Sequence, residues 1–342
     1  MIKIEDIVRP NILNLQPYSS AREEYTGKEG VFLDANENPY GELNRYPDPY
    51  QKALKQKIAA LKNVDSKNIF VGNGSDEIID LTYRIFCNPG VDKALTFTPT
   101  YGMYEVSAGI HNIALLKITL ADTFQIDLEQ LKPLLKENRV KLIFICSPNN
   151  PTGNLMNNSD IEFILKNFNG IVFIDEAYID FAKEESLIRL ISQYNNLIVS
   201  QTFSKAWGLA AARVGLAFAN EEIIALFNKV KPPYNVSQLN QNAALNALNK
   251  PQIYKENIKT ILKEKERLLA ALTQIKRIKK IYPSDANFLL LEVENADFIY
   301  NELVAQQIII RNRNKQVDNC IRVTIGTPEE NNKLIMALKN LR

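Results

Sequence analysis

Short, almost uninterrupted apolar runs recur through the middle of the chain. They occupy residues 94–97, 141–146, 171–174, 197–199 and 214–219. Runs of this length that are rich in Ile, Val and Phe are typical of strands buried on both faces, as in parallel sheets covered by helices. The stretches between them have helical character, and in residues 159–167 (SDIEFILKN) we expect Ser159 to be the N-cap. This alternation predicts an α/β unit whose mostly parallel central sheet is flanked by helices.

The pattern changes about two thirds of the way along the chain, where two adjacent prolines interrupt it. A helix-compatible stretch follows at residues 237–273, with a break near Pro251. Later apolar runs and a last helical segment lie at residues 286–293, 308–311 and 321–325 and from Pro328 onward. We therefore predict a large α/β domain of residues 38–235. A smaller α+β domain would combine residues 236–342 with an N-terminal arm of residues 1–37.

The charge balance excludes some partners. The chain has 41 basic and 39 acidic residues, with no basic block to neutralise a row of phosphates, so we expect no nucleic-acid partner. No stretch reaches the roughly 18 apolar residues that a membrane span needs, and charges interrupt every apolar run near the start. We expect a soluble, cytoplasmic protein with no membrane partner.

Cysteine and histidine usage narrows the chemistry further. The three cysteines (Cys87, Cys146 and Cys320) are far apart and form no CxxC pair, so neither a disulfide framework nor a thiolate zinc site is indicated. The single histidine, His111, excludes HExxH motifs and multi-histidine centres, and we interpret it as structural. We expect no metal site.

Several polar clusters follow the predicted strands at their carboxyl ends, where open α/β sheets bind ligands. In residues 69–81 (IFVGNGSDEIIDL), a glycine turn leads into a helix whose free N–H groups could hold a phosphate. Ser75 as an ordinary N-cap is the alternative interpretation. In residues 144–153 (FICSPNNPTG), the loop could present Asn149 or Asn150 to a ligand, or could be only a tight turn.

Two further clusters carry charged residues. Asp175 ends the apolar run of IVFIDEAYIDF, and a buried carboxylate there requires a donor or a cation. Lys205 lies in SQTFSKAWGLAAARVG, and a partly desolvated lysine is a nucleophile toward aldehydes. Arg213 follows it and has a fork suited to phosphate. Lys205 alone could be a solvated surface residue, but the whole set indicates one cofactor, pyridoxal 5′-phosphate.

These motifs carry a family resemblance over nearly the whole chain. They are, in order, RPNILNLQPYSSARE, LDANENPYG, NRYPDP, GNGSDE, PTYGMY, SPNNPTG, DEAYIDF, SKAWGLAAARVG, IIIRNRN and IRVTIGTPEE. The chain resembles the fold-type I pyridoxal-phosphate aminotransferases (class II), and most closely the branch that acts on histidinol phosphate. The resemblance implies two half-reactions that convert imidazole-acetol phosphate and glutamate to L-histidinol phosphate and 2-oxoglutarate, in histidine biosynthesis.

The resemblance also implies catalytic roles. Lys205 would bond to the cofactor and move a proton between the substrate α-carbon and the cofactor. Asp175 would pair with the pyridine nitrogen and keep it protonated. Tyr178, the third catalytic residue, and Asn150 would bind the 3′-oxygen of the ring, and Tyr101 would stack on its face.

The phosphate would be held by a larger group of residues. They are the backbone N–H groups of Ser75 and Asp76, together with Thr202, Ser204 and Arg213. Tyr46 would reach that phosphate from a neighbouring subunit, so the resemblance implies a homodimer. One departure is Ala211, which stands where the family often has glycine and should require a small packing adjustment.

For the substrate, the family pattern indicates Tyr18, Asn36, Arg311 and Arg322. Two arginines could bind the phosphate of one substrate and the carboxylates of the other. The division between them is left open, and Arg313 is a nearby alternative.

Three rival functions remain. A decarboxylase of a phosphorylated amino acid, such as threonine phosphate, would release carbon dioxide without a keto-acid acceptor. An aminotransferase for aromatic amino acids would keep the cofactor chemistry but change the substrate. A non-catalytic cofactor-binding regulator would usually carry an added DNA-binding domain, for which residues 1–37 are too few.

Overall fold

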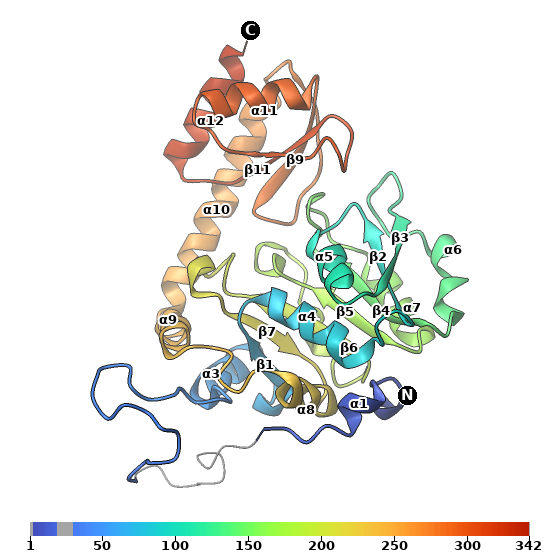
Figure 1. The fold of residues 1–342 in the computed structure, drawn as a ribbon. Helices are drawn as coiled ribbons and strands as arrows, with labels where there is room; N and C mark the ends of the chain where they lie inside the picture. Colours follow the sequence, from blue (N-terminus) through green and yellow to red (C-terminus); the bar gives the residue numbers. More distant parts are fainter. Residues whose placement is uncertain (1–2, 19–29, 342) are drawn as a thin grey trace.

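The computed structural model describes residues 3–18 and 30–341 of the chain. Two sheets lie in two units that are joined by one long helix, α10 (Figure 1). The larger unit contains a seven-stranded sheet and the smaller unit a four-stranded one. This architecture confirms the predicted mixed α/β fold with a large and a smaller unit.

The large sheet has the strand order β1-β7-β6-β5-β4-β2-β3. In that order its strands are Ile69–Gly72, Gly215–Phe218, Leu197–Thr202, Ile171–Asp175, Val140–Cys146, Lys93–Thr98 and Ala114–Thr119. Only β7 runs antiparallel to its neighbours in this sheet, β1 and β6. Each of the five apolar runs predicted as strands coincides with one of these elements, because both faces of the sheet are buried.

Side chains alternate between two cores along the strands of this sheet. In β5, for example, Val172 and Ile174 point to one core, and Ile171 and Phe173 to the other. The first core is covered by α3 (Lys52–Lys62), α6 (Leu128–Leu131), α7 (Asn158–Asn167) and α9 (Gln238–Leu248). The second is covered by α1 (Pro10–Leu13), α4 (Ser75–Phe86), α5 (Met103–Ile110) and α8 (Glu221–Val230). The sheet is therefore a middle layer whose strand ends are the parts left open to a ligand.

The N-cap expected in α7 is wrong. Ser159 lies inside the helix, and Asn157 is its N-cap with extended backbone (φ −62°, ψ 124°). The N–H of Asn157 donates to Gln125 Oε1 at 2.9 Å, which keeps this residue out of the helix. The helix therefore begins earlier than the sequence pattern indicated.

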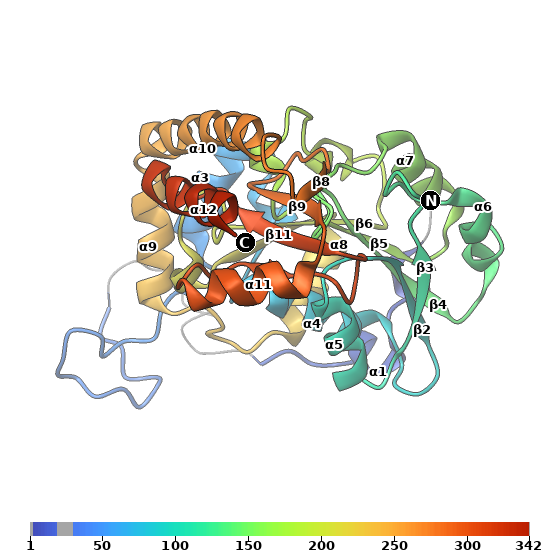
Figure 2. The same cartoon turned by 90° about the horizontal axis from the view of Figure 1, so that it is seen from above.

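The smaller unit has an antiparallel sheet in the order β10-β11-β9-β8. Its strands, in that order, are Arg311–Asn312, Cys320–Thr324, Phe288–Val293 and Ile278–Ile281. Three helices, α10 (Pro251–Leu272), α11 (Ala296–Ala305) and α12 (Pro328–Asn340), contribute to its core. Figure 2 shows α11 and α12 side by side over this sheet.

Helix α10 belongs to two hydrophobic clusters. Tyr254 and Ile258 in its first half pack on a cluster with Tyr178 and Ala206 of the large unit. Leu268, near its other end, is buried in the core of the small unit. Pro251 is the first residue of this helix, as expected for a proline that breaks the long helical stretch.

The N-terminal segment contacts the large unit. Ile4, Val8 and Ile12 lie in the core that contains α4, and the N–H of Arg9 donates to the carbonyl of Ile85 at 3.0 Å. The predicted domain division into residues 38–235 and residues 1–37 with 236–342 stays a prediction. In the structure these N-terminal residues pack on the large unit, from which that division separates them. Further along, the blue segment ahead of α3 loops away from the body in both views (Figures 1 and 2).

Candidate active site

A cavity of about 140 Å³ lies at the carboxyl ends of the central parallel strands. It is lined by Ser75, Asp76, Tyr101, Cys146, Asn150, Asp175, Ala177, Tyr178, Thr202, Ser204, Lys205, Ala210 and Arg213. The structure thus brings together every residue predicted to bind the cofactor from within one chain. Larger hollows lie elsewhere on the surface, but none of those described has both a buried carboxylate and a lysine with a lowered pKa.

Asp175 is the last residue of β5 and is 2% exposed. Its Oδ2 accepts a hydrogen bond from the Tyr104 hydroxyl at 2.8 Å, and its Oδ1 accepts one from the N–H of Ala177 at 3.1 Å. Both donors are neutral. Burial therefore raises the pKa of Asp175 to about 6, although these hydrogen bonds oppose the shift. A cationic group that entered the cavity would find an underpaired carboxylate.

Lys205 lies in the turn that follows β6 (Leu197–Thr202). Its Nζ is 5.6 Å from the centre of the Tyr178 ring and faces the cavity. Surrounding protein desolvates the ammonium group and lowers its pKa, and the nearby Arg322 lowers it further. The amine is therefore closer to its nucleophilic form than a solvated lysine.

The other end of the cavity is built to receive an anion. Helix α4 begins at Ser75, and its N-cap is Gly74 with φ 81°. A Cβ on Gly74 would lie 2.4 Å from Nη2 of Arg213, so the close approach of this guanidinium requires glycine. The N–H groups of the first helical turn and the Arg213 side chain thus converge at one place.

Polar contacts hold Arg213 in that position. Its Nη1 donates to Ser204 Oγ at 3.4 Å, and its Nη2 donates to Asp76 Oδ2 at 3.2 Å. The N–H of Ser204 in turn donates to Oγ1 of Thr202 at 3.1 Å. Arg213 has φ 49° and follows the 3₁₀ turn Ala210–Ala212, in which Ala211 is exposed.

A second group of contacts joins the small unit to the cavity. Asn150 is 5% exposed; its Nδ2 donates to the Tyr178 hydroxyl at 3.5 Å, and its Oδ1 accepts from Nη1 of Arg322. Arg322 lies on β11, where it is paired with Arg311 on β10. Desolvation lowers the pKa of Arg322, and it lowers that of Arg313 to about 10. Three guanidinium groups therefore gather on the side from which Arg322 approaches Asn150.

Five predicted residues do not line the cavity: Tyr18, Asn36, Tyr46, Arg311 and Arg322. Of these, Arg322 contacts a lining residue, Asn150. Tyr18 is 68% exposed and directly precedes residues that the structure does not describe. Tyr46 stacks on Tyr234 with ring centroids 4.4 Å apart and lines, with Asn36, a different hollow. Their roles stay predictions.

Sequence reasoning missed one buried side chain and one side-chain role. Tyr104 is fully buried and bonds Asp175, although only Tyr101 was chosen from PTYGMY. The need of a buried tyrosine hydroxyl for a partner was the signal that could have found it. Asp76 was predicted to act through its backbone, yet its carboxylate also accepts the Tyr101 hydroxyl at 3.0 Å.

Comparisons with known proteins identify the family. Residues 27–338 match the family "Aminotransferase class I and II". A protein of Parabacteroides distasonis named histidinol-phosphate aminotransferase is 51% identical over 100% of both chains. The crystal structure of the histidinol-phosphate aminotransferase from Clostridium acetobutylicum superposes with a TM-score of 0.80 at 28% identity, covering 87% of this chain and 90% of that one.

A second solved structure supports the fold. The Sinorhizobium meliloti histidinol-phosphate aminotransferase, solved in complex with pyridoxal 5′-phosphate, has a TM-score of 0.80 at 23% identity and covers 89% of this chain and 88% of that one. The matched family spans the strands, the cavity and both units described above. The chain belongs to the class I and II aminotransferase family.

Proposed function

We propose that this protein is a pyridoxal-phosphate-dependent transaminase that interconverts imidazole-acetol phosphate plus glutamate and L-histidinol phosphate plus 2-oxoglutarate, in histidine biosynthesis. The observation that carries the proposal is the single cavity in which Lys205, Asp175 and the anion cradle at Ser75 and Arg213 face one another. The relative at 51% identity over the full length supports the choice of substrate.

The residues of the cavity fit the cofactor. The underpaired Asp175 carboxylate suits a protonated pyridine nitrogen, and the cradle beside Gly74 suits a phosphate. Tyr101 lines the cavity between these ends, where its ring would stack on the cofactor. When bound, pyridoxal phosphate supplies an aldehyde that takes up the substrate amino group and a ring that withdraws electrons from the α-carbon.

The remaining roles belong to the chain itself. Lys205 would hold the cofactor through its amine and would carry a proton to or from the substrate α-carbon, a role that its lowered pKa favours. Asp175 would keep the pyridine nitrogen protonated, and Tyr178 with Asn150 would orient the 3′-oxygen. The backbone N–H groups of Ser75 and Asp76, with Thr202, Ser204 and Arg213, would hold the phosphate.

Substrate recognition is assigned to the arginines near Asn150. We propose Arg322 and Arg311, with Tyr18 and Asn36, as the groups that bind the phosphate of histidinol phosphate and the carboxylates of glutamate. Forked guanidinium donors suit both kinds of oxyanion. Arg313 shares this side of the cavity, and its desolvated charge makes it a further candidate.

We also propose a cytoplasmic homodimer. The segment that contains Tyr46 exposes large apolar side chains, since Val31, Leu33 and Tyr40 are 89%, 87% and 83% exposed. Such a cluster suits a protein–protein contact, and Tyr46 would then reach the phosphate site of the partner. The free cysteines Cys87, Cys146 and Cys320 are compatible with a reducing compartment.

The deciding experiment is the visible absorbance of the purified protein before and after addition of L-histidinol phosphate without a keto acid. The proposal expects a cofactor band that bleaches as the amino group is transferred. A band that ignores histidinol phosphate but responds to an aromatic amino acid would overturn the substrate. Release of carbon dioxide from a phosphorylated amino acid would favour the decarboxylase instead.

A further inference from the structure

The Asp175 carboxylate is held by a tyrosine hydroxyl that does not itself line the cavity. Tyr104 has no exposed surface, and its hydroxyl donates to Asp175 Oδ2 at 2.8 Å. The other carboxylate oxygen accepts only a backbone N–H at 3.1 Å. Tyr104 is therefore the side-chain donor that Asp175 uses within the described chain.

Tyr104 has little freedom to move. Its ring stacks on Phe144 with centroids 5.1 Å apart and an interplanar angle of 20°. Tyr101 contacts it edge-on at 5.7 Å. Its backbone carbonyl accepts the hydroxyl of Tyr83, also fully buried, at 2.9 Å. The direction of the Tyr104 hydroxyl is thus fixed by packing before any ligand binds.

Other ionisable groups face Asp175 from each neighbouring element. Asp76 comes from α4 and Cys146 from β4, while Lys205 lies in the turn after β6; Tyr101 and Tyr178 complete the set. Desolvation and Asp76 favour the protonated carboxyl. The hydrogen bond from Tyr104 is the strongest influence in favour of the carboxylate, ahead of the Ala177 N–H and the more distant Lys205.

We propose that Tyr104 is a positioning residue that keeps Asp175 ionised and aimed at the pyridine nitrogen of the cofactor. This inference rests on the proposed function. It assigns to Tyr104 a task that no other described side chain performs, since the second hydrogen bond to Asp175 comes from the backbone.

The consequence is a shift in a pH profile. Protonation of Asp175 must weaken cofactor binding, so affinity should fall below the pKa of this carboxyl, which is about 6 in the wild type. Removal of the Tyr104 hydroxyl makes the carboxylate less stable and moves this fall to higher pH, by about one unit for a charge-assisted hydrogen bond.

The test compares three full-length apoproteins: wild type, Tyr104→Phe and Tyr83→Phe. The dissociation constant of pyridoxal phosphate is measured by absorbance titration from pH 5 to pH 9, together with the thermal unfolding midpoint. Tyr83→Phe is the matched control, because it removes an equally buried tyrosine hydroxyl that bonds the Tyr104 carbonyl and not Asp175. We expect the acidic fall in affinity to move to higher pH in Tyr104→Phe only.

Three outcomes would overturn the inference. Coincident pH profiles for Tyr104→Phe and wild type would reject it while leaving the proposed function intact. Equal shifts in both variants would show a general packing effect. A wild type that does not bind pyridoxal phosphate at any pH would refute the proposed function and this inference with it.

A second variant covers a failure of Tyr104→Phe to fold. Replacement of Tyr104 by 3,5-difluorotyrosine keeps the ring and hydroxyl but makes the hydroxyl a stronger donor, so the fall in affinity should move to lower pH. An unchanged profile for this variant would also reject the inference.

Discussion

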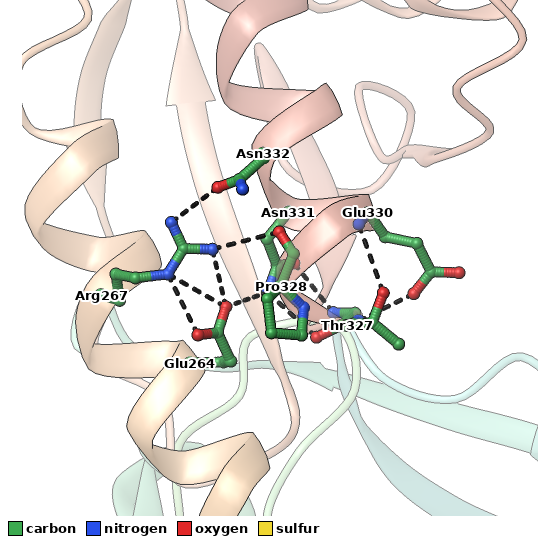
Figure 3. A network of polar contacts seen from close by, with 8 residues as sticks. Glu264, Arg267, Thr327, Pro328, Glu330, Asn331 and Asn332 are labelled. Atoms are coloured by element: carbon green, nitrogen blue, oxygen red, sulfur yellow. Dashed lines mark hydrogen bonds and ion pairs between the residues drawn. The ribbon is translucent and has the colours of Figure 1, made fainter.

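Two buried carboxylates in different regions of the molecule show how burial can serve opposite purposes. Asp175, at the end of β5, accepts hydrogen bonds from two neutral groups, and its pKa rises to about 6. Glu264, between α10 and α12, accepts Nη2 of Arg267 at 2.7 Å and Nδ2 of Asn331 at 2.9 Å. These hydrogen bonds lower the pKa of Glu264 (Figure 3).

Both carboxylate oxygens of Glu264 accept hydrogen bonds from side chains of α10 and α12. Asn331 also bonds both the N–H and the carbonyl of Gly326, and Thr327 with Glu330 forms a capping box at the start of α12. Glu264 therefore has a structural role: it links α10 to α12. The carboxylate of Asp175 is more deeply buried than that of Glu264 but accepts no hydrogen bond from a cation, which is the condition expected of a ligand site.

The largest effect is expected at the lysine that faces Asp175. Lys205→Ala should fold normally and lose turnover by at least about 10³-fold, because it removes both the attachment point and the proton carrier. Lys265→Ala is the control, since burial lowers the pKa of Lys265 too, but its Nζ donates to the carbonyls of Ser284 and Ala286. Steady-state assays that find similar activity in Lys205→Ala and Lys265→Ala would contradict the catalytic assignment.

Asp175→Asn tests the ligand-facing carboxylate itself. It preserves the size of the side chain but removes the charge, so turnover should fall about 10²- to 10³-fold while the protein stays folded. Turnover within a few-fold of wild type would place Asp175 with Glu264 among structural carboxylates.

Asp175→Asn is also the reference for a pH-dependent stability of the wild-type apoprotein. Because burial raises the pKa of Asp175 from 3.8 to about 6, the folded apoprotein binds this proton more tightly than the unfolded chain does. The resulting stabilisation is fully present below about pH 4 and is lost as the pH rises through 6. Relative to Asp175→Asn, the wild-type free energy of unfolding should therefore fall by about 2 kcal/mol between pH 4 and pH 7. Urea unfolding of both apoproteins measures this difference. A difference that does not change with pH would show that the pKa of Asp175 is not raised in the folded apoprotein.

Arg213→Ala tests the anion end of the cavity. Loss of a charge-assisted contact should weaken cofactor binding by about 1.5 to 3 kcal/mol, or roughly 10- to 150-fold. Equilibrium dialysis with pyridoxal phosphate gives the affinity. Unchanged affinity would remove Arg213 from the phosphate site.

The smallest effect on turnover is expected for Glu264→Gln. The free energy of unfolding should fall by about 1 to 2 kcal/mol, because Arg267 loses its ionic partner, while turnover stays near that of wild type. Glu129→Gln is a control with a side chain that is 81% exposed and paired with Lys132, and it should change neither quantity. A large loss of turnover in Glu264→Gln would mean that the contact between α10 and α12 is also needed for catalysis.

The central sheet could be predicted from the sequence because both its faces are buried, which leaves continuous apolar runs. The edge strand β3 was not singled out, since it has only one fully buried residue, Ile118. Strand β8 has no buried residue and was missed for the same reason. The antiparallel direction of β7 depends on its contacts with β1 and β6, which no local pattern encodes.

In the candidate site, too, local patterns could be predicted and contacts between distant positions could not. Residues that end apolar strands, such as Asp175, carry a local signal because a charge there needs a partner. The contact between Asn150 and Arg322 joins positions 172 residues apart, so only the folded chain reveals it. The buried Tyr104 was missed because its partner, Asp175, lies 71 residues away.

The chain contains one tryptophan, and its position has an optical consequence. Trp207 stands two residues after Lys205, and its indole stacks on Tyr254 of α10 with ring centroids 3.9 Å apart. All indole fluorescence therefore originates where the turn that contains Lys205 meets α10, the helix that packs on both the large and the small unit. Trp207 is therefore an intrinsic fluorophore, and we expect its emission to change when the cofactor binds beside Lys205 or when α10 moves against the turn.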